Sequence, residues 1–581
     1  MAIAIYYDGE CPFCKRYTAL LRLRDSVGSV RLVNVRDDSA TLNALQAEGY
    51  DLDQGMVVEL EGRRYAGADA IHTLAILSGR SGLLNRIVAR VFRLAWIAIL
   101  LYPILRAGRA MTLFALGRER IAGNSVEHQS LFTVFSHAWG LLAYLHLLYY
   151  IYYEGSTQVF WTTWMIGGLG AYLTVRARSP RIFVMLCGLL MWDAWQQMPV
   201  FSNHTILRNF VLLAIAAAAI YNLIRGRNWS CFMQSFAPIG RCLLVIMYVF
   251  GVFHKLNDDF LDPSVSCAVA LWQTMPPPLP WLDTEWFRWL AIYGTLIGET
   301  AIILCLLFKP TRQAAIITGI GFHSLLALSG YGFYPTFSTI AVALHLLFLS
   351  PEAATRITTS IQSAILRGGL GERKGQLLTI LWFAGMWLLM KSGNTSSLGL
   401  FWLPWVVWLI YLVGKYGRDL NGEKTLGPTL LSRPWIMNVI SILFFFNCIT
   451  PYLGLKTAQS MNMFANLAVE GDYSNHLLLR GKPGPFNYLD DIVKPLSGGS
   501  HVWAYATGEG LYLTYYDVLN ILERDRNTVV SYERAGMVHE NQSYATLESE
   551  IDRVLHPRWF RNWFLFRPID IRSPKPCSLS Q

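Results

Sequence analysis

Charged residues are scarce in this chain. Aspartate, glutamate, lysine and arginine together make up 15% of its 581 residues, whereas 53% are hydrophobic. So small a charged fraction is atypical of a soluble multidomain enzyme and typical of a polytopic membrane protein. The formal net charge of +10 is then expected in cytoplasmic loops rather than in a nucleic-acid-binding patch, so no nucleic-acid partner is predicted.

Cysteine is also scarce, with nine residues in the whole chain. Only Cys11 and Cys14 form a close pair, and most others fall in apolar stretches, where a buried thiol behaves as a small hydrophobic group. No disulfide-built extracellular scaffold is therefore expected. Signal-peptide features are missing too, because Met1 leads straight into AIAIYYDGE without a basic start or a cleavage site.

Short apolar runs alternate with helical patterns over residues 1–80. Strands are predicted at 2–7 and 30–35, a hairpin at 55–65, and helices after Cys14, near 40–48 and at 68–78. This β-α-β-α-β-β-α order is thioredoxin-like. The sequence therefore predicts a thioredoxin-like redox domain at 1–80.

Cys11 and Cys14 open the first of these helices. A thiol at a helix N-terminus lies at the positive end of the helix dipole, which lowers its pKa and raises the thiolate fraction. Lys15 and Arg16 add positive charge, and two intervening residues permit a reversible disulfide. Zinc binding and a purely structural role are the alternatives. A single CxxC offers only two ligands, however, so no metal is predicted.

The segments YYDGECPFCKRY and GMVVELEGRRYAGADAI resemble the DCC thiol–disulfide oxidoreductase family. That family is named for an Asp-Cys-Cys motif, which Asp8, Cys11 and Cys14 match here. The resemblance covers roughly residues 1–120. It implies a thioredoxin-like fold and makes the two cysteines the candidate redox residues.

Arginines crowd residues 81–124 around the apolar run LAWIAILLYPIL. That run is too short to span a bilayer comfortably. An amphipathic helix on the cytoplasmic membrane face, attracted to anionic lipid, is the preferred interpretation, and a solvated linker is the alternative.

A transmembrane domain is predicted at 125–455. About eleven apolar stretches approach the roughly 20 residues that a bilayer needs. They are 131–153, 157–175, 181–200, 204–224, 240–257, 286–308, 312–329, 335–350, 377–393, 398–414 and 434–452.

Basic loops alternate along this domain with loops poor in lysine and arginine. The basic loops are 176–181, 225–229, 309–312, 367–374 and 415–418. Because they are alternate loops, they share one side of the membrane, which the positive-inside rule makes cytoplasmic. The chain is thus predicted to cross the cell inner (plasma) membrane many times, with a cytoplasmic N-terminus and an extracytoplasmic C-terminus.

Polar residues gather toward the outer ends of the spans. Asn203 and His204 begin the fourth span, His254 and Lys255 end the fifth, Glu299 lies inside the sixth and His323 inside the seventh. Singly, each is more typical of a structural role, such as an interfacial histidine or a lysine that snorkels to the membrane surface. Together they could converge on one cavity, because intramembrane charges are expensive and mark functional sites. Burial would disfavour the ammonium form of Lys255 and make it a usable base.

Four segments are similar to the HTTM family, which includes vitamin K-dependent gamma-glutamyl carboxylase. They are SNHTIL (202–207), VFGVFHKLNDDFLD (249–262), GFHSLLALSGYGFYPTFSTIAVALHLLFLSP (321–351) and PYLGLKTAQSMNMFANL (451–467). The resemblance covers roughly residues 125–480.

This second resemblance implies a quinone/hydroquinone cofactor, with Lys255 as the base that deprotonates the hydroquinone. It further implies that Asn203 and His204 support the oxygenated intermediate or the carboxylation step. His323 lies in a matching helix, and the resemblance makes it a further candidate site residue. His254 and Asn257 stand where the family segment has lysine and aspartate. The resemblance therefore does not extend to glutamate as the substrate.

The remaining residues, 456–581, predict an extracytoplasmic β-rich tail. The segments 454–479, 501–506, 510–522 and 528–536 suggest short strands, and 544–553 a helix. The fold class predicted for the whole chain is a polytopic α-helical membrane protein with an N-terminal thioredoxin-like α/β domain and this C-terminal domain.

Three functions fit these features. The first is a membrane enzyme, carboxylase-like, that uses a reduced quinone and oxygen with Lys255 as base. The second is a thiol–disulfide oxidoreductase that exchanges electrons with membrane quinone through Cys11 and Cys14. The third is a transporter or maturation factor for a secreted peptide. The expected partners are the lipid bilayer, a quinone and, for peptide modification, a secreted peptide or protein.

Overall fold

The computed structural model divides the chain into two compact units. One comprises residues 1–125 with 431–438, and the other 126–430 with 439–581. The residues described are 3–9, 30–48, 50, 52, 55–77, 94, 125–154, 160–177, 179–198, 202–224, 229–329, 334–367, 371–391, 395–418, 429–432, 434–471, 473–481 and 484–577.

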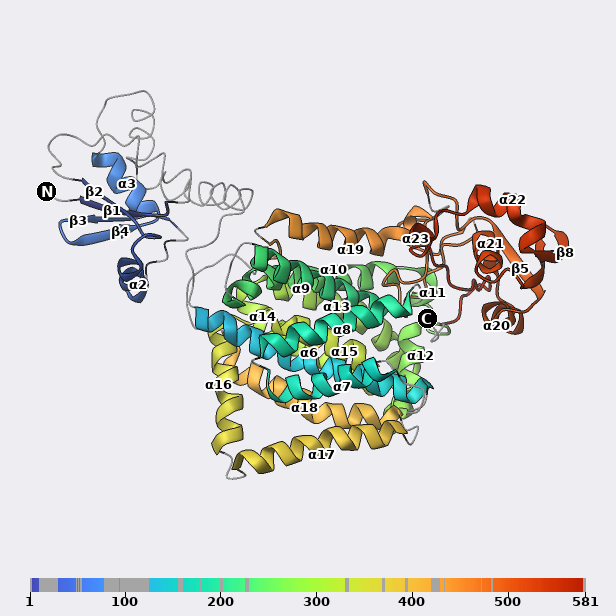
Figure 1. The fold of residues 1–581 in the computed structure, drawn as a ribbon, viewed down its shortest axis with the longest axis horizontal. Coiled ribbons are helices and arrows are strands. Elements are labelled where there is room, and N and C mark those ends of the chain that lie inside the picture. The colour runs from blue at the N-terminus through green and yellow to red at the C-terminus, as the bar shows by residue number, and fades with distance from the viewer. Residues whose placement is uncertain are drawn as a thin grey trace, which may run out of the picture. The chain divides into compact units, whose positions relative to one another are not determined.

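The N-terminal unit contains a four-stranded mixed sheet with the strand order β2-β1-β3-β4 (Figure 1). β1 pairs in parallel with β2, whereas β3 pairs antiparallel with both β1 and β4. The elements are β1 (Ile3–Tyr7), β2 (Val30–Asn34), α2 (Ser39–Ala47), β3 (Val57–Leu60), β4 (Arg63–Ala66) and α3 (Ala68–Leu77). The small α/β sheet predicted from sequence is thereby confirmed.

Alternating apolar residues explain this sheet. Ile3 and Ile5 of β1 pack with Val58 and with Ala70 and Leu74 of α3 in one buried cluster. The hairpin between β3 and β4 turns at Glu61 and Gly62, both of which have positive φ, as its predicted Glu-Gly turn requires. Two predicted features lie outside the described residues. They are the helix after Cys14 and the interfacial segment 81–124, of which only Leu94 is described.

Helices dominate the second unit (Figure 1), and each of the eleven predicted spans coincides with one. They are α6 (Ser125–Glu154), α7 (Trp161–Val175), α8 (Pro180–Gln197), α9 (Asn203–Ile224), α10 (Phe232–Lys255), α13 (Glu285–Leu307), α14 (Lys309–Ala327), α15 (Tyr334–Leu346), α17 (Gly371–Lys391), α18 (Thr395–Tyr416) and α19 (Val439–Ile449). A further helix, α16 (Pro351–Arg367), was not predicted because half of its residues are polar.

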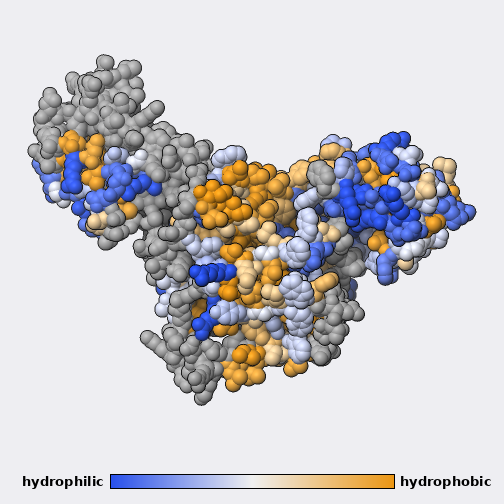
Figure 2. All heavy atoms as spheres, in the orientation of Figure 1, coloured by the Kyte–Doolittle hydropathy of each residue, from blue (hydrophilic) through white to orange (hydrophobic). Residues whose placement is uncertain are grey.

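Six helices in the described part of the chain are long and apolar enough to cross a membrane. These stretches are Ser130–Tyr152, Asn203–Ile224, Phe232–Lys255, Glu285–Leu307, Leu398–Tyr416 and Trp435–Leu453. The chain is therefore compatible with a multi-pass membrane protein. Figure 2 shows hydrophobic side chains gathered over this helical bundle and hydrophilic ones over the C-terminal region.

The C-terminal region carries a second sheet, of order β6-β5-β7-β8, together with helices. Its elements are β5 (Ile492–Gly498), α20 (His501–Glu509), β6 (Leu513–Thr514), α21 (Tyr515–Arg524), β7 (Val529–Arg534), β8 (Met537–Ser543), α22 (Tyr544–Val554) and α23 (Arg558–Arg561). The strand predicted at 528–536 and the helix predicted at 544–553 are confirmed as β7 and α22.

Two strand predictions in this region were wrong. Residues 501–506 lie in α20, and most of 510–522 lies in α21, with only Leu513 and Thr514 in a strand. Helix caps decide the outcome, because the side chains of Ser500 and Thr514 accept hydrogen bonds from the first turns of α20 and α21. The predicted strands at 454–479 were also wrong, since the described residues there form turns and one isolated bridge.

A disulfide joins Cys267, at the start of the short helix α12 (Cys267–Gln273), to Cys577 near the end of the chain. Cys267 and Cys577 are therefore exceptions to the expectation that most cysteines outside the close pair are small hydrophobic groups. The two residues are 310 positions apart, and such a separation leaves no spacing pattern in the sequence. The bond ties the C-terminal segment to the helical bundle.

Candidate functional site

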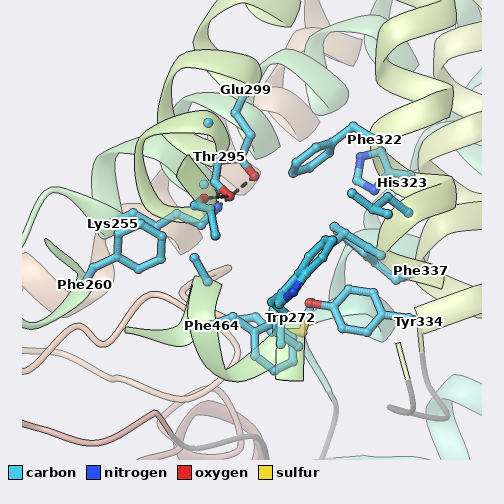
Figure 3. A pocket seen from close by; sticks show the side chains of 18 of the residues that line it. Lys255, Phe260, Trp272, Thr295, Glu299, Phe322, His323, Tyr334, Phe337 and Phe464 are labelled. Carbon is cyan, nitrogen blue, oxygen red and sulfur yellow. Dashed lines mark hydrogen bonds and ion pairs between the residues drawn. The ribbon is translucent and has the colours of Figure 1, made fainter. Parts of the chain in front are cut away.

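A pocket of about 330 Å³ lies among α10, α12, α13, α14, α15 and the loop that follows α19 (Figure 3). Most of its lining is apolar or aromatic, which is typical of sites for small organic ligands. Its aromatic walls include Phe260, Trp272, Phe287, Phe322, Phe337 and Phe464.

Lys255 and Glu299 form an ion pair on one side of this pocket (Figure 3). The Lys255 ammonium donates to both carboxylate oxygens of Glu299, at 2.7 and 2.6 Å. Lys255 is only 8% exposed and Glu299 7%, so this lysine does not snorkel out to the surface. A charge pair enclosed by aromatic side chains is strengthened by the low local dielectric.

Local capping explains why Lys255 ends its helix inside the protein. α10 stops at Lys255, and Asn257 then caps the short helix α11 (Asp258–Leu261) by accepting from Phe260 N at 2.7 Å. The Asn257 amide also donates to His254 O and Ala465 O. These bonds fix the backbone directly after Lys255, whose side chain meets Glu299 of α13.

His323 lines the pocket on the other side from the Lys255–Glu299 pair in Figure 3. Its Nε2 lies 2.9 Å from the hydroxyl of Tyr248, which lies 3.2 Å from His345 Nε2. His323 Nδ1 is buried and has no hydrogen-bond partner among the described residues. Of the six polar residues expected to converge on one cavity, Lys255, Glu299 and His323 line this pocket.

Asn203 and His204 do not line the pocket. Asn203 accepts a hydrogen bond at 2.8 Å from the backbone of Met461, which does line it. His204 bonds to the Ser202 hydroxyl instead, at 2.8 Å. His254, the neighbour of Lys255, points to Tyr452 and Ser460. The structure thus makes Asn203 a support of the pocket wall rather than one of its lining groups.

The pocket-lining loop has an unusual backbone. Gln459, Met461, Phe464 and Asn466 all have φ between 52° and 61°, in the left-handed region that disfavours side chains larger than glycine. Such conformations persist only where contacts with neighbouring residues hold the backbone in place and offset its strain. Asn466 shows how, because its side chain accepts from Cys267 N and donates to the Val265 and Lys575 carbonyls.

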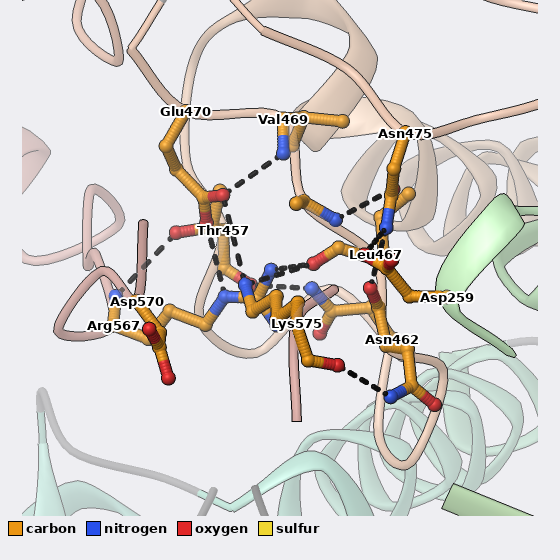
Figure 4. Close-up of polar contacts among 12 residues, drawn as sticks. Asp259, Thr457, Asn462, Leu467, Val469, Glu470, Asn475, Arg567, Asp570 and Lys575 are labelled. Atoms are coloured by element: carbon orange, nitrogen blue, oxygen red, sulfur yellow. Dashed lines mark hydrogen bonds and ion pairs between the residues drawn. The ribbon is translucent and has the colours of Figure 1, made fainter. Parts of the chain in front are cut away.

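Charged residues near the C-terminus form a buried cluster that contacts the same loop (Figure 4). Arg567 and Lys575 both donate to the Leu467 carbonyl. Glu470 compensates their charges, at 3.0 Å from Arg567 and 3.9 Å from Lys575. The segment 567–577 therefore acts as a strap across the pocket-lining loop.

Acid is expected to weaken this strap. Burial would raise the pKa of Glu470, but Arg567, Lys575 and the Val469 N–H lower it to about 2. In the unfolded chain this carboxylate takes up a proton near its ordinary pKa of 4.5, so its stabilisation is lost as the pH falls below that value. Between pH 5 and pH 3 we expect the wild type to lose about 2 kcal/mol of unfolding free energy more than Glu470→Gln does.

Chemical unfolding in detergent at both pH values measures this difference. Glu548→Gln, which changes an exposed glutamate on α22, is the control and should follow the wild type. If Glu470→Gln and the wild type lost the same unfolding free energy between these pH values, the Glu470 carboxylate would not stabilise the strap as predicted.

The thiol motif begins at Asp8, directly after β1. Asp8 is buried, and its carboxylate accepts from Arg36 Nε at 2.6 Å. The next residue, Gly9, donates from its backbone to Asn34 Oδ1 at 2.8 Å. Asp8 therefore anchors the edge at which β1 and β2 end, just before the predicted redox pair. Cys11 and Cys14 themselves lie outside the described residues.

Sequence reasoning missed Tyr248, His345 and the disulfide. A histidine within the apolar run ALHLL was a usable signal, because ionisable residues inside membrane spans are rare. Tyr248 gave no such signal. Within the described ranges, no group of three or more histidine, cysteine or acidic side chains is arranged to hold a metal ion.

Residues 5–114 match the family model of the DCC1-like thiol-disulfide oxidoreductases. This match supports a thiol–disulfide redox role for the N-terminal part of the chain. No curated protein and no solved structure matches the chain. The family model covers no part of the helical unit, where the HTTM-like and carboxylase-like resemblance stays a prediction.

Proposed function

We propose that the chain is a membrane oxidoreductase whose aromatic pocket binds a reduced quinone and whose Lys255–Glu299 pair accepts a proton from it. The observation that carries the proposal is this buried pair, both of whose members line an apolar pocket built from membrane-type helices. Ionisable side chains at such depth are costly and are retained at functional sites.

The residues of the pocket suit a planar aromatic ring with polar edges. Trp272, Phe322 and Phe337 offer faces and edges for ring contacts. The ionisable groups of the pocket lie apart, with Lys255 and Glu299 on one side and, on the other, His323, whose Nδ1 has no partner among the described residues (Figure 3). When bound, a reduced quinone supplies two electrons and two protons, and oxygen is the proposed electron acceptor.

The pair offers two ways of taking up a proton. With Lys255 as the ammonium, the Glu299 carboxylate is the acceptor. If Lys255 first passes its proton to Glu299, the neutral amine becomes the acceptor. Both routes end with a Lys255 ammonium beside a protonated Glu299. That positively charged pair can hold the anion left on the ligand.

The direct test is oxidation of a reduced quinone by purified protein, followed as oxygen uptake. General-base catalysis is commonly worth 10² or more in rate, so Lys255→Ala is expected to lower uptake by about 10²-fold. Lys494→Ala removes an exposed lysine on β5 and should leave the rate unchanged. Full activity in Lys255→Ala would refute the proposal. Incorporation of labelled carbon dioxide into a peptide would test the carboxylase-like extension.

The family match favours a second function, in which the Cys11/Cys14 dithiol exchanges electrons with membrane quinone. This reaction needs no oxygen. A Cys11→Ser/Cys14→Ser protein should then lose dithiol-driven quinone reduction under anaerobic conditions, while Lys255→Ala keeps it. Retention of that activity by the double cysteine variant would exclude this function.

The predicted membrane orientation gains support from the disulfide. Cys267 lies in the loop 257–285, which the positive-inside rule places outside, and Cys577 lies in the tail predicted on the same side. Disulfides persist in oxidising compartments and are rare in the cytosol. We therefore infer an inner-membrane protein whose C-terminal region is extracytoplasmic and whose N-terminal domain is cytoplasmic.

A further inference from the structure

Two histidines and a tyrosine form a buried hydrogen-bonded row, of which His323 and Tyr248 line the pocket and His345 does not. His345 Nδ1 lies 2.7 Å from the Ala341 carbonyl, Tyr248 Oη lies 3.2 Å from His345 Nε2, and His323 Nε2 lies 2.9 Å from Tyr248 Oη. His345 lies on α15, Tyr248 on α10 and His323 on α14. Three helices that are separate in sequence thus meet in a single row.

The Ala341 carbonyl sets the direction of every bond in this row. A carbonyl oxygen can only accept, so His345 Nδ1 carries the proton. Neither histidine forms an ion pair among the described residues, and both are buried, so both are neutral. His345 Nε2 is then a bare acceptor, and the Tyr248 hydroxyl donates to it. The Tyr248 oxygen in turn accepts from His323 Nε2–H.

The row ends at His323 Nδ1, which must therefore be unprotonated. This atom is buried and has no partner among the residues that the structure describes. Buried polar atoms are almost always satisfied, and an exception points to a missing partner. Since His323 lines the pocket, the natural partner is a hydrogen-bond donor on a bound ligand.

A glycine on α14 makes room for the row. A Cβ added at Gly319 would lie 2.1 Å from His345 Nε2, the atom that accepts from Tyr248. Any larger residue at this position would displace the imidazole. Two residues along the same helix, a Cβ at Gly321 would meet nothing within 4 Å. The two glycines therefore form a matched pair for experiment.

We propose that Tyr248 and His345 are positioning residues that hold His323 in the tautomer with a bare Nδ1. This gives the pocket a second proton acceptor, apart from the Lys255–Glu299 pair. The ligand class that fits is an aromatic ring bearing two hydroxyl groups, one donating on each side. This inference rests on the proposed function, which it extends from one ligand hydroxyl to two.

Nitrogen NMR of histidine-labelled protein tests the tautomer without any ligand. The His323 signals are assigned by their loss in His323→Gln. In the wild type and in Gly321→Ala we expect Nδ1 of His323 to be unprotonated. In Tyr248→Phe and Gly319→Ala, where the row is broken, we expect a mixture of tautomers. A protonated Nδ1 in the wild type, or an unchanged tautomer in both row variants, would overturn the inference.

Binding of two probe ligands then tests the ligand class. Anaerobic titration compares 1,4-dihydroxynaphthalene with 1,4-dimethoxynaphthalene, which cannot donate. The wild type and Gly321→Ala should prefer the dihydroxy compound, and Tyr248→Phe and Gly319→Ala should reduce that preference roughly fivefold. An unreduced preference would overturn the two-acceptor assignment. If neither compound binds the wild type, the proposed function fails, whereas the NMR result still decides the role of Tyr248 and His345.

Discussion

Replacing Lys255 by methionine is expected to lower the free energy of unfolding of the helical unit by about 3–5 kcal/mol. The lysine is 8% exposed, and its ammonium contacts both oxygens of a carboxylate that is itself buried. Lys255→Met leaves Glu299 as an uncompensated charge among aromatic side chains. The penalty comes mainly from that isolated carboxylate, because methionine has similar length and fills the same space.

A double variant separates this explanation from a simple loss of packing. Exchange of a buried ion pair for apolar side chains of similar volume is often neutral or stabilising. Lys255→Met/Glu299→Met should therefore recover most of the stability lost in Lys255→Met, although it stays inactive. Denaturation in mixed detergent measures all three proteins. If the double variant were less stable than either single variant, the two residues would be acting through packing and not as a charge pair.

Loss of the Cys267–Cys577 disulfide has the second large expected effect. Removal of a native disulfide commonly costs 2–5 kcal/mol, and the cost rises with the length of the closed loop. With the two cysteines 310 positions apart, we expect Cys577→Ser to lose about 3–5 kcal/mol. The pocket wall should be destabilised as well, because α12 begins at Cys267 and contributes Ala268, Leu271 and Trp272 to that wall.

The two cysteines should behave as one unit in this experiment. Cys267→Ser, Cys577→Ser and the double variant are each expected to lose the same stability within about 0.5 kcal/mol, since any of them removes the whole bond. Cys305→Ser changes a free cysteine in α13 and serves as the control. Additive losses in the double variant, or wild-type stability in Cys577→Ser, would contradict the assignment.

The helical part of the fold was readable from the sequence because its signals are local. Apolar stretches of bilayer length gave the helices, and a lysine and a glutamate within them marked a site. Their pairing was not readable, since Lys255 and Glu299 lie 44 positions apart and on different helices. The row from His345 to His323 depends on three helices and on space at Gly319, which no periodicity encodes.

The errors in the C-terminal region have a different cause. Tyr515 and Val518 have residue types enriched in strands, and with Leu519 and Leu522 they belong to one apolar run, which favoured a strand prediction. Their spacing of three and four positions is that of a helix, and all four are buried in one core cluster. Spacing was the better guide there than residue type. The disulfide partner Cys577 could be found only from the tertiary structure.

Photoaffinity labelling tests the central claim, that this pocket binds quinone, most directly. Membranes containing the full chain would be irradiated with an azido-quinone, digested and mapped by mass spectrometry. We predict labelled peptides from α12, α13 and the loop at Met461–Phe464, with labelling suppressed by excess unmodified quinone. Competed labelling confined to other parts of the chain, or pocket labelling that excess quinone does not suppress, would contradict the proposed function.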